Sequence, residues 1–143
     1  MTLALDGLSP VARQTVETIR DGGVVAVLRA PEASLLAKAA DVLVSNGVRA
    51  VEFALTTDGA LGALERYCSS ATPSGSPGAT GSEAGACVGA GTVLTAEEAR
   101  RAVEAGARYL VTPAFVPEVV ATGTELGVPV IAGAFTPTEI LAA

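Results

Sequence analysis

The residue best suited to acid–base chemistry in this sequence is Glu52, the only carboxylate inside an expected strand, residues 50–55. Strand alternation places it on the face opposite Val51 and Phe53, whose bulk suits packing against helices. Burial of a charged group is costly unless the group is paired or protonated. We therefore expect Glu52 to act as a general acid or base with an adjusted pKa. A structural ion pair with Arg29 is the alternative interpretation.

Further candidates follow other expected strands, where α/β proteins gather their ligand-binding residues. Arg29 follows the strand at 24–28 and could hold a carboxylate or phosphate, although its side chain could equally extend into solvent. The segment Gly89–Thr92 offers glycines for close backbone approach and a threonine hydroxyl for a ligand. It lacks the third glycine of a dinucleotide-binding loop. Thr112 and Pro113 end the next strand in the same layer, where a plain strand terminator is the alternative.

The composition excludes several kinds of site. Without histidine there is no Ser-His or Cys-His catalysis and no imidazole zinc site. Cys68 and Cys87 are too few for a disulfide framework or an all-cysteine zinc site, and we expect them to be reduced thiols. Lys38, the only lysine, lies on the polar side of an amphipathic helical pattern and should face solvent. We therefore expect neither a metal nor a cofactor.

The charge balance limits the possible partners. The 143 residues carry a formal net charge of -6 and have a pI of about 4.5. Nucleic acids and anionic membranes both require a basic surface, so neither is an expected partner. No apolar run approaches the ~18 residues of a membrane span, and the first ten residues lack the basic start of a secretion signal. We expect a cytoplasmic protein.

Short β-branched runs alternate with helical periods along one domain, residues 1–143. The run at 24–28 is continuously apolar, which predicts a strand buried on both faces. Strands are expected at residues 24–28, 50–55, 87–93, 109–112 and 128–132. Helix starts are predicted at Pro10, Pro31, Thr57, Thr95 and Thr136, the last two with capping boxes. Residues 69–85 are rich in Gly, Ser and Pro and read as a flexible surface insertion.

Five βα units predict a parallel sheet covered by helices. The chain length suits an open, doubly wound, flavodoxin-like sheet, whereas a (β/α)8 barrel normally takes ~200 residues or more. A response-regulator-like variant of the open fold would need an acidic pair after the first strand, where the sequence has Arg29-Ala30-Pro31. Composition alone favours the open fold.

The motifs favour the barrel. The segments VVAVLRA (24–30), GVRAVEFALTT (47–57), VGAGTVLTAEEA (88–99), EAGARYLVTPAF (104–115) and GVPVIAGAFTPTE (127–139) occur in one order. Together they resemble the 2-keto-3-deoxy-6-phosphogluconate (KDPG) aldolase family, which includes 4-hydroxy-2-oxoglutarate aldolase. The resemblance implies a class I aldolase on a (β/α)8 TIM barrel, typically a homotrimer, that needs no metal. This chain would supply about five βα units of the barrel, preceded by an extra N-terminal helix.

The resemblance also implies roles for single residues. Glu52 matches the glutamate that shuttles protons, Thr92 the threonine that binds the pyruvate carboxylate region, and Pro113 the proline that ends the fourth strand in the pocket. Many members have an arginine at the position of Thr56. Phosphogalactonate-specific relatives instead use an arginine after the first strand, which Arg29 matches. The sugar acid epimer is therefore left open by these residues.

The family's Schiff-base lysine lies on a sixth strand, and no segment of this sequence matches it. We expect the chain to be C-terminally truncated relative to the family and to lack this nucleophile. The expected substrates are a 2-keto-3-deoxy-6-phospho sugar acid, giving pyruvate and glyceraldehyde 3-phosphate, or 4-hydroxy-2-oxoglutarate, giving pyruvate and glyoxylate. The alternatives are 2-keto-3-deoxy-6-phosphogalactonate as substrate, or an inactive remnant or weak keto-acid-binding module.

Overall fold

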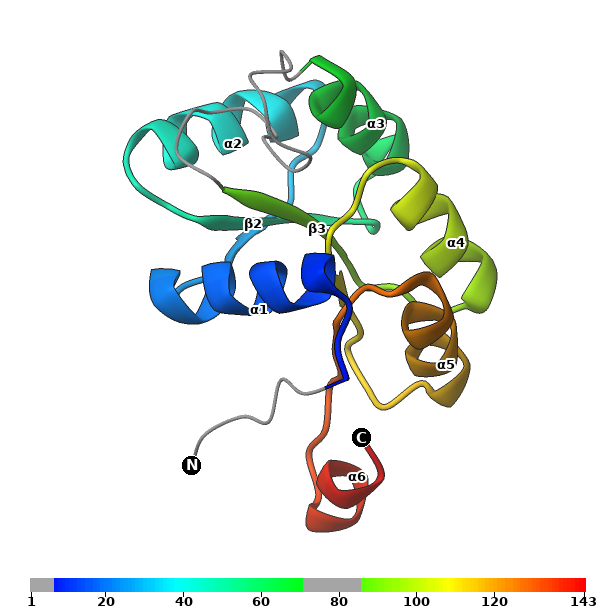
Figure 1. Cartoon of the computed structure of the whole chain (residues 1–143). Coiled ribbons are helices and arrows are strands. Elements are labelled where there is room, and N and C mark those ends of the chain that lie inside the picture. The colour runs from blue at the N-terminus through cyan, green and yellow to red at the C-terminus, as the bar shows by residue number, and fades with distance from the viewer. Residues whose placement is uncertain (1–6, 71–85) are drawn as a thin grey trace.

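The computed structural model describes residues 7–70 and 86–143, which contain one parallel sheet of five strands with helices packed around it (Figure 1). The strands are β1 (Ala26–Leu28), β2 (Ala50–Ala54), β3 (Cys87–Gly91), β4 (Leu110–Val111) and β5 (Val130–Ile131). The helices are α1 (Pro10–Gly22), α2 (Ser34–Ser45), α3 (Ala60–Ser70), α4 (Ala96–Glu104), α5 (Pro117–Leu126) and α6 (Pro137–Ala142). The predicted insertion at 69–85 thus begins within α3, and its residues 71–85 lie outside the described part of the chain.

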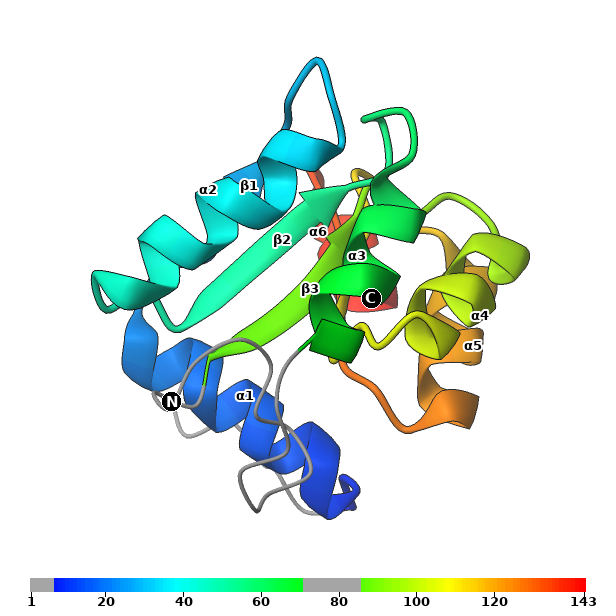
Figure 2. The same cartoon turned by 90° about the horizontal axis from the view of Figure 1, so that it is seen from above.

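The strand order decides between the two predicted architectures. Strands β1 to β5 lie side by side in the order of the sequence. An open doubly wound sheet would reverse its order, as in the flavodoxin-like order 2-1-3-4-5, and would carry helices on both faces. In a (β/α)8 barrel every crossover steps the same way and the helices form an outer ring, as α2 to α5 do here (Figure 2). The prediction of part of a barrel is confirmed, and the flavodoxin-like and response-regulator-like alternatives are wrong.

Several helices begin where their capping residues predicted. The Ser9 hydroxyl accepts a hydrogen bond from the Ala12 N–H at 3.1 Å at the start of α1. At α4 the Thr95 hydroxyl accepts from the Glu98 N–H, and the Glu98 carboxylate accepts from the Thr95 N–H, each at 3.1 Å. The same reciprocal pair starts α6 at Thr136. These side chains satisfy backbone donors that a helix start otherwise leaves unpaired.

Two helices begin later than predicted: α2 begins at Ser34, three residues after Pro31, and α3 begins at Ala60, two residues later than a cap at Thr57 implies. A hydrogen-bonded turn after Pro31 precedes α2. Thr57 is buried, and its hydroxyl accepts from the Ala30 N–H at 3.3 Å. Its side chain therefore joins the loops that follow β1 and β2 instead of capping a helix.

Strand β1 differs most from its prediction. The apolar run predicted burial on both faces, yet the Val27 side chain is 49% exposed and its neighbours Ala26 and Leu28 are only half-buried. Among the described residues β1 pairs with β2 alone, so it is an edge strand, and its inner face at Val27 lies open. In contrast, every residue of β2 and β3 is buried. The continuous apolar run thus predicted the strand correctly, but its prediction that both faces are buried was wrong.

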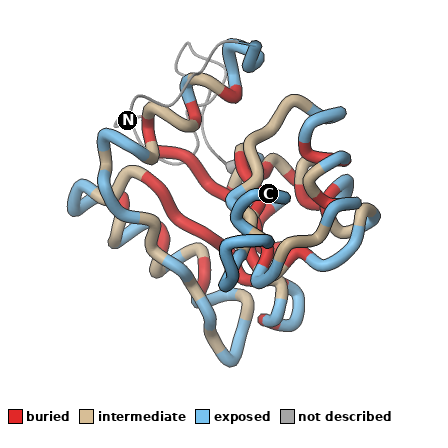
Figure 3. Tube along the Cα trace, turned by 90° about the horizontal axis from the view of Figure 1, so that it is seen from below, coloured by how far each residue is buried: buried red, intermediate tan, exposed pale blue. Residues whose placement is uncertain are grey.

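The main core lies between the outer face of the sheet and α2 to α5, as the buried positions in Figure 3 show. Phe53 of β2 and Tyr67 of α3 meet there with ring centroids 5.6 Å apart. The extra N-terminal helix α1 packs on the opposite, inner side of β2 and β3 (Figure 1). There Ile19 contacts a small cluster formed by Ala50, Cys87 and Tyr109.

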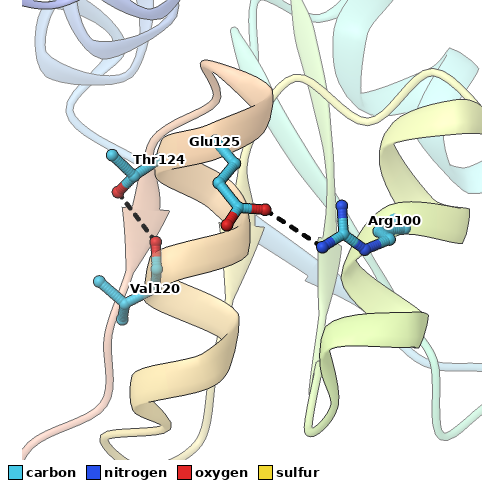
Figure 4. A network of polar contacts seen from close by, with 4 residues as sticks. All are labelled: Arg100, Val120, Thr124 and Glu125. Carbon is cyan, nitrogen blue, oxygen red and sulfur yellow. Dashed lines mark hydrogen bonds and ion pairs between the residues drawn. The ribbon is translucent and has the colours of Figure 1, made fainter.

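Polar contacts reinforce the outer helices. An ion pair of 3.1 Å joins Arg100 of α4 to Glu125 of α5, and within α5 the Thr124 hydroxyl donates to the Val120 carbonyl (Figure 4). Helix α6 has no buried residue, and Phe135 just before it is 98% exposed. Within the described residues, no helix is both long enough and apolar enough to cross a membrane.

Candidate active site

Glu52 lies in the middle of β2 and is only 4% exposed. Its neighbours Val51 and Phe53 are fully buried in the core that the outer helices cover. Because successive side chains of a strand point to opposite faces, Glu52 faces the inner side of the sheet. The orientation predicted from strand alternation is confirmed.

The Glu52 side chain occupies space that Gly91, one of two glycines in β3, leaves free. Its backbone lies opposite Gly89 in the parallel register, whereas its carboxylate lies against Gly91, the last residue of β3. A Cβ atom on Gly91 would overlap this carboxylate. The sequence predicted that these glycines admit close backbone approach, and the structure shows that side chains of neighbouring strands use the space.

Burial sets the protonation behaviour of Glu52. Loss of solvent raises the pKa of Glu52 above its ordinary value, and the positive charge of Arg29 partly offsets this rise. Both residues are described, yet no hydrogen bond or ion pair joins them, so the alternative of a structural ion pair is not formed. A raised pKa brings a carboxyl group closer to the range in which a general acid or base works best.

The other predicted site residues follow consecutive strands. Arg29 follows β1, Thr56 follows β2, Thr92 follows β3 and Pro113 follows β4. Arg29, Thr56 and Pro113 are exposed, and Thr92 is half-buried. Because the strands are parallel neighbours, these residues share the carboxyl edge of the sheet, where barrel enzymes bind their substrates.

Thr92 has an unusual backbone conformation. Its φ of 60° is the only positive value at a non-glycine residue in the described chain. A β-branched residue rarely adopts this left-handed conformation, and such strain persists where the surrounding structure enforces it. This strained residue directly follows Gly91, against which the Glu52 carboxylate lies.

Three further residues support the site: Thr112 was predicted as a strand-end candidate, Thr57 was predicted only as a helix cap, and Tyr109 was not a candidate. The Tyr109 ring covers Gly89, and its hydroxyl donates to the Val51 carbonyl at 2.8 Å. Thr57 and Thr112 are buried threonines whose hydroxyls each accept from a backbone N–H that follows an edge strand, β1 or β5, at 3.3 Å. Their only sequence signal is a polar hydroxyl at a strand end.

The remaining reactive groups lie away from this arrangement. Lys38 is exposed on α2, as predicted. Cys68 and Cys87 are free, and burial raises the pKa of each thiol to about 11, so both are protonated at neutral pH. Neither cysteine has the character of an activated nucleophile.

The fold and these residues define a parallel α/β protein with a buried carboxyl group, of raised pKa, beside the carboxyl edge of its sheet. The family model described as "Aldolase: KDPG and KHG aldolase" matches residues 15–143. The chain belongs to this family, as its motifs predicted.

Similar proteins are aldolases of this kind. The chain is 35% identical over 130 residues to the 2-dehydro-3-deoxy-phosphogluconate aldolase of Treponema pallidum, across 89% of this chain and 53% of the relative. It is 30% identical over 119 residues to a probable 2-dehydro-3-deoxy-6-phosphogalactonate aldolase of Rhizobium meliloti, across 83% and 51%. A KDPG aldolase structure from Legionella pneumophila, with pyruvate captured as a covalent carbinolamine, superposes with a TM-score of 0.63 at 26% identity, across 82% and 52%. The chain spans about half the length of the curated relatives it matches.

Proposed function

We propose that this chain supplies the proton-transfer and keto-acid-binding part of a class I aldolase site. The observation that carries the proposal is the buried Glu52 carboxyl, whose pKa is raised, beside the carboxyl edge of the sheet. Membership of the KDPG and KHG aldolase family supports it.

Glu52 would serve both proton transfers of such a reaction. In class I chemistry an amine adds to the keto carbon, and the resulting carbinolamine loses its hydroxyl as water after receiving a proton. A base then takes the proton from the substrate hydroxyl, the carbon–carbon bond breaks, and its electron pair moves into the imine. One carboxyl that gives a proton and later takes one meets both needs, which suits the raised pKa of Glu52.

The amine of this chemistry is not expected from the 143 residues. Their only lysine, Lys38, lies exposed on α2 in the outer layer. We propose that these residues bind the keto acid without forming a Schiff base.

Arg29 and Thr92 are the proposed ligands for the carboxylate of the substrate. Arg29 is exposed just after β1, and its positive charge lowers the pKa of Glu52. Thr92 lies half-buried just after β3. Thr56 and Pro113 would line the same edge of the sheet. The proposed products are pyruvate with glyceraldehyde 3-phosphate, from a 2-keto-3-deoxy-6-phospho sugar acid, or pyruvate with glyoxylate, from 4-hydroxy-2-oxoglutarate.

A phosphogalactonate substrate is the second candidate. Thr56 replaces the arginine common in the family, and Arg29 occupies the position that phosphogalactonate-specific relatives use. The similarity to the probable phosphogalactonate aldolase of Rhizobium meliloti also favours this substrate.

We also propose that the protein forms a homo-oligomer, as the family implies.

Pyruvate binding tests the proposal directly. In a 1H–15N NMR titration we expect pyruvate to shift the amide signals of Thr92 and Glu52. Arg29→Gln should weaken binding at least ~10-fold, because a charged hydrogen bond is worth about 1.5–3 kcal/mol. The matched control is Arg101→Gln, which removes an exposed arginine of α4.

Borohydride reduction with pyruvate completes the experiment. No covalent adduct should form on the 143-residue chain, and an adduct mapped to Lys38 would overturn the assignment of that residue. Absence of any pyruvate-dependent shift at Thr92 and Glu52 would refute the binding proposal itself.

A further inference from the structure

The position of the Glu52 carboxylate along the sheet is set by what the neighbouring strands leave free. In the parallel register Glu52 pairs with Gly89, and Ala54 pairs with Gly91. The Glu52 carboxylate nevertheless lies against Gly91, so the side chain leans two residues toward the carboxyl edge. This lean brings the acid group to the end of β3, one residue from Thr92.

The space directly opposite Glu52 is already filled. The Tyr109 ring lies where a side chain of Gly89 would be, with Cδ2 2.6 Å from the position of that Cβ. Tyr109 is fully buried, which raises the pKa of its hydroxyl, and the nearby Cys87 and Glu52 add smaller contributions to that rise. The two glycines thus accept two side chains in order: Tyr109 over Gly89 and Glu52 over Gly91.

We infer that Gly91 is a positioning residue, whose missing side chain forms the slot that holds the Glu52 carboxylate at the substrate edge of the sheet. The inference rests on the proposed role of Glu52 in proton transfer. It assigns the second glycine of Gly89–Thr92 to the orientation of a protein carboxylate rather than to close approach by a ligand. Every atom that a Gly91 side chain would meet within 2.7 Å belongs to the Glu52 side chain beyond Cβ.

A double-mutant cycle on the full 143-residue chain tests the slot. Gly91→Ala should raise the unfolding equilibrium constant about 100-fold. An effect of this size is near the upper limit of the interaction energies found between residues in contact. In a Glu52→Ala background, which removes the overlapping atoms, the same change should cost less than about 10-fold. If Gly91→Ala alone does not fold, recovery of a cooperative transition in the double variant supports the slot equally well.

Gly123→Ala is the matched control. A Cβ on Gly123 of α5 would collide with Val130, so this variant is overpacked without touching Glu52. Its cost should be the same in the wild-type and Glu52→Ala backgrounds. The inference would be overturned if Gly91→Ala changed the unfolding equilibrium constant equally in the wild-type and Glu52→Ala backgrounds. It would also be overturned if the Gly91→Ala/Glu52→Ala double variant remained unfolded.

A second readout separates positioning from mere packing. The pKa of Glu52, followed through its carboxyl 13C signal, should fall toward the ordinary glutamate value in Gly91→Ala, because the displaced carboxylate meets water. It should not move in Gly123→Ala, and an unchanged pKa in folded Gly91→Ala would also overturn the inference. Neither readout uses pyruvate, so a failed titration with an intact cycle rejects the proposed function and leaves the slot in place.

Discussion

Replacing Glu52 by glutamine should stabilise the chain at neutral pH and leave its stability almost unchanged in acid. Burial raises the pKa of Glu52 in the folded state, and Arg29 offsets part of the rise. In the unfolded chain a glutamate titrates with a pKa of about 4.3. Between these two pKa values the folded state holds a proton that the unfolded state has released. The free energy of unfolding therefore falls as the pH rises through this interval.

The size of the effect follows from one proton. The free energy of unfolding should fall by about 1.4 kcal/mol per pH unit within the interval and be level above the folded-state pKa. Glutamine has the same shape without the charge, so Glu52→Gln should lack this slope. Arg29→Gln should extend the interval to higher pH, because it removes the charge that lowers the pKa of Glu52. At 4% exposure, Glu52 has little solvent to weaken either effect.

Urea unfolding followed by far-UV circular dichroism, from about pH 4 to about pH 8, measures the difference between Glu52→Gln and the wild type. Glu104→Gln, which neutralises an exposed carboxylate of α4, controls for the change in net charge. A difference that stays constant with pH, or a Glu52→Gln variant that gains stability in acid, would refute the reasoning.

Two further outcomes concern the elements around the site. Tyr109→Phe should cost about 1 kcal/mol of unfolding free energy, because the variant loses the 2.8 Å hydrogen bond to the Val51 carbonyl; an unchanged urea midpoint would show that this bond contributes nothing. The Arg100–Glu125 ion pair is half-exposed, so a double-mutant cycle to alanine should give a coupling below about 1 kcal/mol that shrinks as salt is added. A larger coupling that does not change with salt would contradict the expectation that this half-exposed ion pair contributes little to stability.

The side of the sheet to which the residues of β2 point was predictable from the sequence. Alternation and the bulk of Phe53 placed Phe53 outward and Glu52 inward, and all five residues of β2 are buried. The same reasoning failed for Val27, because sequence does not record that β1 is an edge strand with an open inner face.

The contents of the site were less predictable than its position. The motif Gly89–Thr92 drew attention to the right place, but the sequence does not say which side chain fills the space above a glycine. Glu52 lies in β2 and Tyr109 directly precedes β4, so only the pairing of these strands with β3 reveals that the two residues fill the spaces above its glycines. Thr57 illustrates the same limit, because a threonine after a strand predicts a helix cap as readily as a bond to the neighbouring loop.

The two faces of β2 and β3 divide stability from chemistry. Their outer residues are fully buried against helices, and the two strands pair along their full five-residue length. Their inner face carries Glu52, a buried carboxyl where an apolar side chain would contribute more to folding, and Gly89 and Gly91, whose missing side chains make room for Tyr109 and Glu52. A destabilising carboxyl group can be tolerated on the inner face because the outer face of the same strands is fully packed against helices. If Glu52→Gln is more stable at neutral pH than the wild type, the retained glutamate is the cost of keeping a titratable group at the substrate edge, as expected of a catalytic position rather than a structural one.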